Sequence, residues 1–269
     1  MEVGLHNKFY IYLLFLIFST NVYAVEFKGD FKQGSFILGK ASPDTKVFID
    51  NRNIRVSKEG YFAFGLDRDR KNDVIINIQK DGETKKIIKK IFKRKYKIQR
   101  IDGLPPKQVT PPPEVYERIK KDNILIGKAR SVDTAFDFFK NKFIYPIDKY
   151  IITGLYGSQR VLNGKPRRPH YGIDFHAPEG TPVKAMMDGE VTLAEIDMYF
   201  TGGTIIFDHG HGISTLFMHM KDIDVKVGQK VKQGQIVGTL GQSGRATGPH
   251  LDIRLNWFNV KLDPATILN

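Results

Sequence analysis

The 269-residue chain contains no cysteine. Disulfides therefore play no part in its stability, and a zinc site built from thiolates is excluded. Any metal site has to be built from histidine, aspartate, glutamate or water. Histidine is also unevenly placed: none occurs between residues 25 and 169, and six of the seven histidines lie between residues 170 and 250. A histidine-based site therefore belongs to the C-terminal part of the chain.

Long apolar runs are scarce, with one exception near the N-terminus. Residues 9–18 (FYIYLLFLIF) are continuously apolar, follow Lys8, and precede small residues at Val22 and Ala24. This pattern predicts a signal peptide over residues 1–24, with cleavage after Ala24. The run is shorter than the ~20 residues that span a membrane, and an uncleaved anchor is the alternative. In either case we expect an exported protein of the periplasm or cell envelope.

Acidic residues are outnumbered by basic ones, 29 against 42, so the net charge is +13. Residues 1–24 contain one lysine and one glutamate, so their removal leaves this charge unchanged. A basic exported protein is attracted to polyanions, namely peptidoglycan peptides, acidic lipid headgroups or nucleic acid. Export disfavours nucleic acid, and we expect no nucleic-acid partner. The charge alone does not choose between the wall and the membrane.

Residues 25–103 contain short apolar segments separated by turn signals about every ten residues. Segments 36–39, 47–49 and 74–78 favour strands, and Asp81-Gly82 is typical of a hairpin turn. The pattern predicts a small N-terminal β-sandwich without catalytic residues. Within it, residues 85–97 hold eight basic residues. They form either a strip that contacts the wall or a membrane surface, or the last strand of the sandwich with solvated lysines; we favour the second, and both can hold.

Residues 104–142 are expected to connect two domains. Residues 104–113 (LPPKQVTPPP) are half proline, which predicts an extended, semi-rigid linker. From residue 114 to residue 141, apolar positions such as Ile119 and Phe136 have helical spacing. Gly127 is expected to divide this connector into two helices.

Residues 143–269 are richer in glycine and in β-favouring residues. Strands are expected over residues 183–195, 203–208, 212–217, 231–240 and 250–257, with glycines at the turns between them. Strands this short and this often interrupted predict a curved antiparallel β-sheet domain. The predicted fold class is therefore mainly β, with an N-terminal sandwich, a helical connector and a C-terminal sheet.

Three short segments of this C-terminal region place polar groups where they can converge. His170 and Asp174 are four residues apart, so they share a face of an extended strand. His250 and Asp252 flank Leu251 and also share a face, while His219 ends an apolar strand at a sheet rim. Each pair alone is weak evidence, and together they predict a metal site.

The surrounding sequence strengthens this interpretation. The blocks RPHYGIDFHAPEGTPVKAMMDGEV, DHGHGISTLFMHM and VKVGQKVKQGQIVGTLGQSGRATGPHL resemble, in order and spacing, the signature blocks of the M23 (lysostaphin/LytM-like) metallopeptidase family. The resemblance covers roughly residues 145–265 and implies an M23-like β core. It implies that His170 and Asp174 are zinc ligands, and that His219 and His250 are the two catalytic histidines that are not ligands.

The sequence departs from the family at the third ligand, where the second histidine of a His-x-His motif is replaced by Asp252. Zinc accepts carboxylate oxygen at nearly the same distance as imidazole nitrogen, so a His170, Asp174 and Asp252 set can hold one Zn²⁺. A zinc ion with two carboxylate ligands acidifies its bound water less than a zinc ion with one carboxylate ligand does. Two carboxylates also favour metals that prefer oxygen ligands. The alternative is that Asp252 is no ligand and the domain has become a binding module.

The remaining histidines are expected to have structural roles. His209 lies at a strand-to-turn boundary where a hydrogen bond is expected, His211 is expected to be exposed in the turn, and His176 is a structural or rim residue. Trp257 and Phe258 are expected in the core.

The resemblance implies a zinc-dependent endopeptidase that cleaves peptide cross-links of peptidoglycan, with stem peptides as the bound partner. A catalytically impaired LytM-like domain that regulates cell-wall amidases or binds the wall is the alternative, and cell-wall amidases or envelope division proteins would then be partners. A third hypothesis is an envelope adaptor that acts through residues 25–104.

Overall fold

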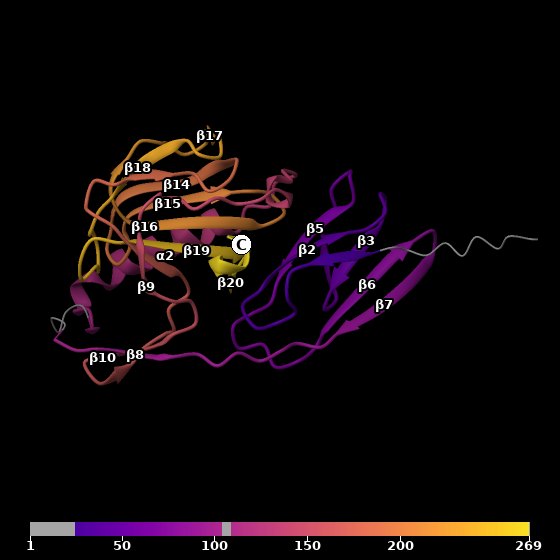
Figure 1. Cartoon of the computed structure of the whole chain (residues 1–269), viewed down its shortest axis with the longest axis horizontal. Helices are drawn as coiled ribbons and strands as arrows, with labels where there is room; N and C mark the ends of the chain where they lie inside the picture. The colour runs from indigo at the N-terminus through magenta and orange to yellow at the C-terminus, as the bar shows by residue number, and fades with distance from the viewer. Residues whose placement is uncertain (1–24, 104–108, 269) are drawn as a thin grey trace, which may run out of the picture.

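A computed structural model describes residues 25–103 and 109–268 of the chain. Two β-rich halves lie side by side, and an extended segment runs along both of them (Figure 1). The predicted signal peptide lies outside the described residues. In the part of the chain that is described, no helix is long and apolar enough to cross a membrane.

The N-terminal half is the predicted small β-sandwich. One sheet has the order β1-β2-β5 and the other the order β4-β3-β6-β7. Alternate residues of β6, such as Val74 and Ile76, face a core that the first sheet shares through Ile37 and Phe62. The strands are β1 (Glu26–Lys28), β2 (Phe36–Lys40), β3 (Lys46–Ile49), β4 (Arg52–Ile54), β5 (Tyr61–Gly65), β6 (Val74–Lys80) and β7 (Glu83–Lys89).

Two sequence features of this half have the structure that was expected. Asp81 and Gly82 adopt φ angles of 51° and 81° and close the β6–β7 hairpin, in which Lys80 pairs with Glu83. The basic segment 85–97 begins in β7, the edge strand of its sheet. Ile91 is buried there, whereas Phe92 is 63% exposed, so only part of the segment's apolar side reaches the core. Its contact with a membrane surface stays a prediction.

The C-terminal half is built on a ten-stranded antiparallel sheet in which β17-β14-β15-β16-β19-β12-β9 are neighbours in this order. β13 pairs with β18, β18 also pairs with β16, and β20 pairs with β19. The strands are β9 (Ile151–Gly154), β12 (Ile173–His176), β13 (Pro182–Lys184), β14 (Gly189–Met198), β15 (Gly202–Asp208), β16 (Ile213–Ile223), β17 (Lys230–Val231), β18 (Ile236–Leu240), β19 (Leu251–Trp257) and β20 (Val260–Leu262). The predicted mainly β fold with a C-terminal antiparallel sheet is confirmed.

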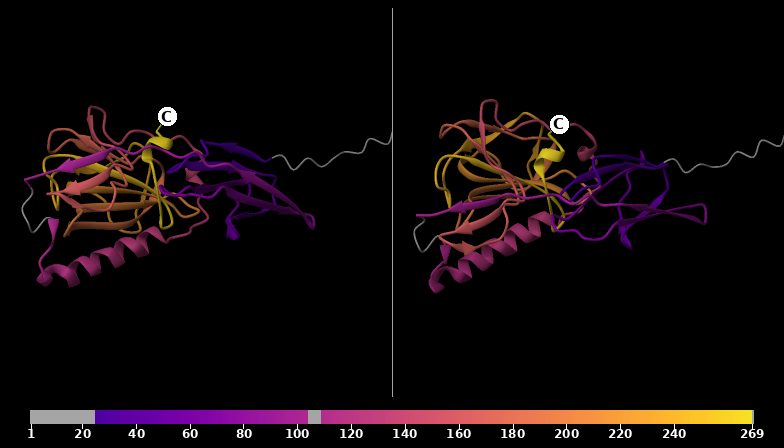
Figure 2. Two further views of the ribbon diagram at one scale, coloured as in Figure 1. Left: turned by 90° about the horizontal axis from the view of Figure 1, so that it is seen from below. Right: turned by 60° about the horizontal axis from the view of Figure 1, so that its bottom comes forward.

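Helix α2 (Tyr116–Arg130) covers one face of this sheet (Figure 2). Ala129 and Ile126 pack there against Leu193 of β14, Ile206 of β15 and Leu216 of β16. Both faces of β16 are therefore covered, which explains why its first eight residues are all buried. The short 3₁₀ helices are η1 (Pro113–Val115), η2 (Phe138–Lys140) and η3 (Pro264–Thr266).

The prediction that Gly127 divides the connector into two helices is wrong. α2 continues through Gly127 and ends at Arg130. A side chain at position 127 would meet no neighbouring atom, so the glycine neither enables a close approach nor needs a special backbone conformation there. A single glycine lowers helix stability by about 1 kcal/mol relative to alanine, which packing of α2 on the sheet can offset.

The extended segment after the sandwich joins the C-terminal half. β8 (Ile98–Ile101) pairs in parallel with β10 (Gln159–Leu162), which pairs in turn with β11 (Lys165–Pro166). This pairing crosses the predicted domain boundary at residue 103. The domain limits themselves remain a prediction.

The turn between β15 and β16 is packed inside the molecule. His209 is fully buried, with its Nδ1 2.8 Å from the Asp188 carbonyl oxygen and its Nε2 2.8 Å from Thr215 Oγ1, as expected of a structural histidine. The prediction that His211 is exposed is wrong, because its side chain is buried and its ring lies 4.7 Å from that of Phe139. The connector folds over this turn, a contact between segments distant in the sequence.

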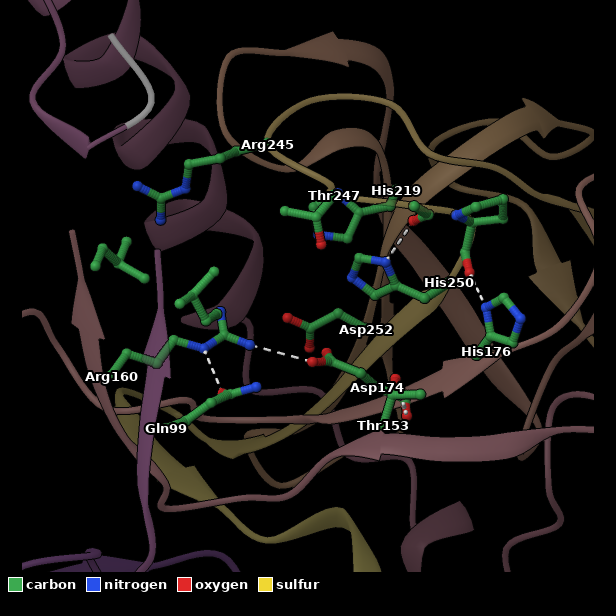
Figure 3. Close-up of a pocket in the computed structure, with 14 residues that line it drawn as sticks. Gln99, Thr153, Arg160, Asp174, His176, His219, Arg245, Thr247, His250 and Asp252 are labelled. Carbon is green, nitrogen blue, oxygen red and sulfur yellow. Dashed lines mark hydrogen bonds and ion pairs between the residues drawn. The ribbon is translucent and has the colours of Figure 1, made fainter. Parts of the chain in front are cut away.

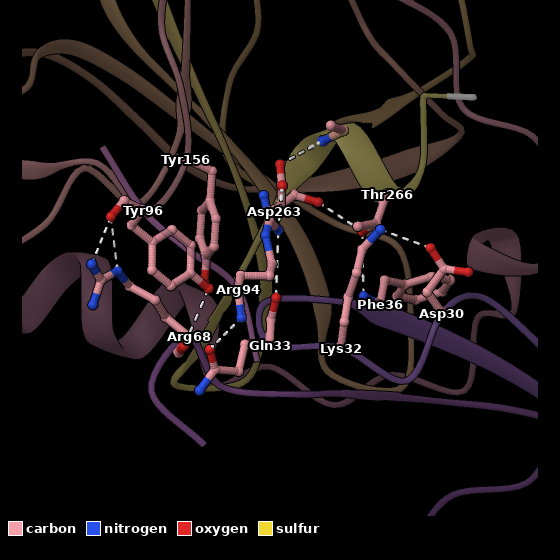
Figure 4. Close-up of polar contacts among 12 residues, drawn as sticks. Asp30, Lys32, Gln33, Phe36, Arg68, Arg94, Tyr96, Tyr156, Asp263 and Thr266 are labelled. Atoms are coloured by element: carbon pink, nitrogen blue, oxygen red, sulfur yellow. Dashed lines mark hydrogen bonds and ion pairs between the residues drawn. The ribbon is translucent and has the colours of Figure 1, made fainter. Parts of the chain in front are cut away.

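The two halves are also joined by buried polar contacts (Figure 4). Arg94 Nη1 lies 2.8 Å from Asp263 Oδ2, while Asp263 Oδ1 accepts a hydrogen bond from the Ala265 backbone at the start of η3. The guanidinium of Arg68 donates two hydrogen bonds to the Gly157 carbonyl oxygen. These contacts tie residues 68 and 94 of the first half to residues 157 and 263 of the second, which follow β9 and β20.

We predict that Asp263→Ala lowers the free energy of unfolding by about 2 kcal/mol, because it removes a charge-assisted bond and a helix cap at a buried site. Urea unfolding measures this change. Asp30→Ala is the matched control, since Asp30 is 74% exposed and its pair with Lys32 lies on the surface. An equal effect of both substitutions would contradict the assigned role of Asp263.

A second prediction concerns pH. Burial lowers the pKa of His209 to about 4. The unfolded chain therefore binds a proton at this residue between about pH 6.5 and pH 4 whereas the folded chain does not, so acid reduces stability in that window. Between pH 7 and pH 5, wild type should lose roughly 2 kcal/mol more than His209→Gln. Urea unfolding at both pH values tests this, and identical pH dependence of the two proteins would refute it.

Candidate metal centre

Two buried carboxylates face each other on neighbouring strands near the β9 edge of the C-terminal sheet. β12 and β19 pair in antiparallel fashion, and Asp174 is the register partner of Asp252. Their side chains are 6% and 2% exposed. Glycines make room for them: a side chain at Gly154 would clash with Asp174, and one at Gly172 would clash with Asp252. Like charges directly opposite each other destabilise a sheet, so this pair requires positive charge nearby.

His170 supplies the third donor. It lies just before β12, is 1% exposed, and points Nε2 at both carboxylates, 3.0 Å from Asp174 Oδ1 and 3.3 Å from Asp252 Oδ2. Burial opposes protonation of His170, but the two carboxylates outweigh burial and raise its pKa. The structure thus brings together the three residues that the sequence predicted as ligands.

The three donors fit a tetrahedral zinc ion. Ligand atoms about 2.0–2.1 Å from zinc lie about 3.3 Å apart at tetrahedral angles, close to the spacings of His170 Nε2 from the two carboxylates. One ligand atom from each residue lies within 4.8 Å of the other two. Apart from the 3.0 Å contact with His170 Nε2, Asp174 Oδ1 is buried without a hydrogen-bond partner, as expected of an oxygen available to a metal. Three protein ligands also leave a fourth position for water or substrate.

Two arginines, which sequence reasoning missed, hold the carboxylates: Arg160 contacts the Asp174 oxygen that does not face His170, and Arg254 contacts both oxygens of Asp252. Arg160 Nη2 lies 3.1 Å from Asp174 Oδ2 (Figure 3). Arg254, two residues along β19 and on the same face, reaches Asp252 with Nη2 at 3.1 Å and Nε at 3.3 Å. Burial of Asp252 favours its neutral form, but Arg254 and His170 outweigh burial and hold its pKa well below the usual range. The i+2 spacing of Arg254 was the available sequence signal.

His219 and His250 lie together beside the carboxylates, with ring centroids 4.7 Å apart (Figure 3). Each ring uses Nδ1 in a 2.8 Å hydrogen bond to a backbone carbonyl oxygen, that of Ser243 for His219 and that of Gly248 for His250. A carbonyl oxygen only accepts, so Nδ1 carries the hydrogen and Nε2 is left with a lone pair. Burial, reinforced by His250, lowers the pKa of His219 to about 4.

The prediction that His219 ends its strand is wrong. β16 continues to Ile223 through an irregularity in its pairing, and His219 itself has a φ of 65°. His176 is exposed, as expected for a rim residue, and its Nδ1 lies 2.7 Å from the Pro249 carbonyl oxygen. Trp257 is 6% exposed, in line with the expected core position.

Two hollows meet at the centre. Asp252, His219, Arg160 and Arg245 line both of them. One hollow is walled by Gln99 and Ile101 of β8, and Gln99 Oε1 lies 3.3 Å from Arg160 Nε. Nothing in the local sequence of β8 indicates that this strand lies beside the cleft, because its place depends on pairing with β10, some 60 residues away. The arrangement is a cleft with three metal donors and two proton acceptors.

Comparison with known proteins agrees with this arrangement. Residues 168–264 match peptidase family M23. The chain is 40% identical over 113 residues to the peptidoglycan DD-endopeptidase ShyA of Vibrio cholerae, which covers 41% of this chain and 26% of that protein. It is 42% identical over 104 residues to the glycyl-glycine endopeptidase ALE-1 of Staphylococcus capitis, covering 37% and 29%. The chain thus spans less than a third of the length of either relative.

The fold extends beyond the matched region. A crystal structure of a putative M23 peptidase from Pseudomonas aeruginosa superposes with a TM-score of 0.68 over 89% of this chain and 95% of that one, at 24% sequence identity. At this identity the superposition establishes the fold of both halves. The sequence match and the arrangement of the C-terminal sheet agree: residues 168–264 of this chain form a domain that matches peptidase family M23.

Proposed function

We propose that this chain is an exported, zinc-dependent endopeptidase that cleaves peptide cross-links of peptidoglycan in the cell envelope. The observation that carries the proposal is the convergence of His170 Nε2 with one oxygen each of Asp174 and Asp252. The names of relatives that act on peptidoglycan support the substrate class, as does the net charge of +13, because stem peptides carry free carboxylates.

In this proposal His170, Asp174 and Asp252 hold the zinc ion. When bound, zinc supplies Lewis-acid polarisation of the scissile carbonyl and makes an attacking water more acidic. Arg160 fixes the Asp174 oxygen that does not face His170, and Arg254 fixes both oxygens of Asp252, so that the two carboxylates keep their orientation toward His170. Carboxylates whose negative charge is shared with guanidiniums donate less charge to the ion, and this partly offsets the replacement of a neutral histidine by Asp252.

The two remaining histidines handle the proton. With hydrogen on Nδ1 and a lone pair on Nε2, either His219 or His250 accepts the proton of the attacking water. Burial, together with the charge of His250, lowers the pKa of His219 to about 4, so the His219 ring is neutral near pH 7 and can accept a proton. The ring that receives the proton becomes a donor, and it passes the proton to the leaving amine or stabilises the oxyanion.

A second candidate function is a catalytically impaired domain that regulates cell-wall amidases or binds the wall. The contacts of Arg254 and Arg160 favour it, because the two carboxylates are matched by two guanidiniums through protein contacts alone. A domain of this kind would retain the cleft and use it for binding. Cell-wall amidases or envelope division proteins would be its partners.

Metal content and turnover separate these functions. We predict about one zinc per wild-type chain by elemental analysis and cleavage of cross-linked muropeptides. Asp252→Ala should abolish both, because a buried ligand is lost. The exposed Asp224→Ala is the matched control and should preserve both. Wild-type protein that binds no zinc and cleaves nothing with several added divalent metals would exclude the endopeptidase and favour the regulator.

The role of the histidines has its own test. His250→Ala should retain the zinc and lower kcat by about 10²–10⁴-fold, because proton transfer is lost while the ligands remain. Elemental analysis and steady-state kinetics on the same preparation measure the two effects. Loss of zinc from His250→Ala would instead make this residue a ligand, contrary to the proposed assignment.

A further inference from the structure

A groove leads from the metal centre toward α2, and cations dominate its lining. Seven arginines and lysines line it, whereas Asp252 is the only acidic residue among the described residues that do. Its volume of about 620 Å³ falls in the range of ~300–1,000 Å³ typical of ligand clefts. We call this cleft the basic groove, defined by Arg130 of α2, Arg168, Arg254 of β19 and Lys261 of β20.

Not all of these cations are engaged by the protein itself. Arg254 and Arg160 hold the two carboxylates, and Arg167 donates hydrogen bonds to the backbone of Val109 and to the Thr110 side chain. Arg130, Arg168 and Lys261, in contrast, form no ion pair with any described residue, and Lys261 Nζ lies 4.5 Å from the centre of the Tyr171 ring. The buried Nε of Arg130 has no hydrogen-bond partner in the described structure.

These three side chains also repel one another. Burial and the charge of Arg254 lower the pKa of Arg130. Burial and the charges of Arg130, Arg254 and Arg168 lower the pKa of Lys261. Like charges gathered in a partly buried cleft raise the local positive potential and concentrate anions there. The floor beneath them is apolar, formed by Ile126, Leu216 and Met218.

We propose that Arg130, Arg168 and Lys261 form a carboxylate-binding subsite, which reads the free carboxylates of the peptide whose scissile bond lies at the metal centre. The inference rests on the proposed function and names the substrate feature that the cleft selects. His170, His219 and Asp252 line the same groove, so a chain bound at the centre continues directly into it. The apolar floor can contact methyl groups of a peptide, and the cations above it can bind the peptide's carboxylates. A flat membrane surface cannot enter a concave cleft.

The experiment measures binding of full-length protein to cross-linked muropeptides whose free carboxylates are either intact or amidated. Wild type should bind the intact form about tenfold or more tightly, the effect of roughly one charge-assisted contact. The double variant Arg130→Gln, Lys261→Gln should lose most of this preference, as should Arg168→Gln at an exposed position that folding does not depend on. Zinc content and thermal midpoint are measured on each variant.

Matched controls remove charge elsewhere. Lys128 lies on the same helix as Arg130 but is exposed and outside the groove, and Lys226 is exposed and far from Lys261 in sequence. The controls are Lys128→Gln and Lys226→Gln. Both should keep the wild-type preference. The preference should also weaken as salt is added to wild type, and less so in the double variant.

The outcomes separate this inference from the function it rests on. Cleavage by wild type together with an unchanged carboxylate preference in the groove variants would overturn the subsite and leave the endopeptidase intact. Lost preference in the variants of a protein that cleaves nothing would sustain the subsite and reject the endopeptidase. Tighter binding of a phosphate-rich polymer than of intact muropeptides, with the same dependence on Arg130 and Lys261, would overturn the carboxylate assignment.

Discussion

The site depends on one electrostatic constraint: two buried aspartates, Asp174 and Asp252, stand directly opposite each other on neighbouring strands. Such a pair is unstable unless positive charge surrounds it. The neighbouring structure meets this requirement. His170 contacts one oxygen of each carboxylate, Arg160 contacts the other oxygen of Asp174, and Arg254 contacts both oxygens of Asp252. The same geometry that makes the pair costly alone makes it a binding site for a divalent cation.

The replacement of a family histidine by Asp252 is better understood together with Arg254. An aspartate bonded through both its oxygens to a guanidinium carries a much smaller net charge than an isolated carboxylate, while one oxygen still faces His170. Aspartate and arginine on the same strand face thus act as one unit. The proposed zinc site and the basic groove share this unit, so in this proposal Arg254 links the binding of the metal to the binding of the substrate.

Local patterns in the sequence predicted much of this architecture. Alternating apolar residues and hairpin signals such as Asp81-Gly82 indicated the sandwich, and the spacing of His170, Asp174 and Asp252 indicated which side chains share a face. What local patterns could not predict are contacts between distant segments. The burial of His211 under the connector, the uninterrupted helix at Gly127 and the approach of Arg160 to Asp174 all depend on tertiary packing that no short spacing encodes.

The parallel pairing of β8 with β10 has a consequence for the cleft. The strand that closes one wall of the cleft is supplied from the N-terminal side of the proline-rich segment, and it is held to β10 by four residue pairs. Without it, β10 would present an open sheet edge and Arg160 would lose Gln99. The wall of the cleft that Gln99 and Ile101 form is therefore built from the segment through which the chain leaves the N-terminal half.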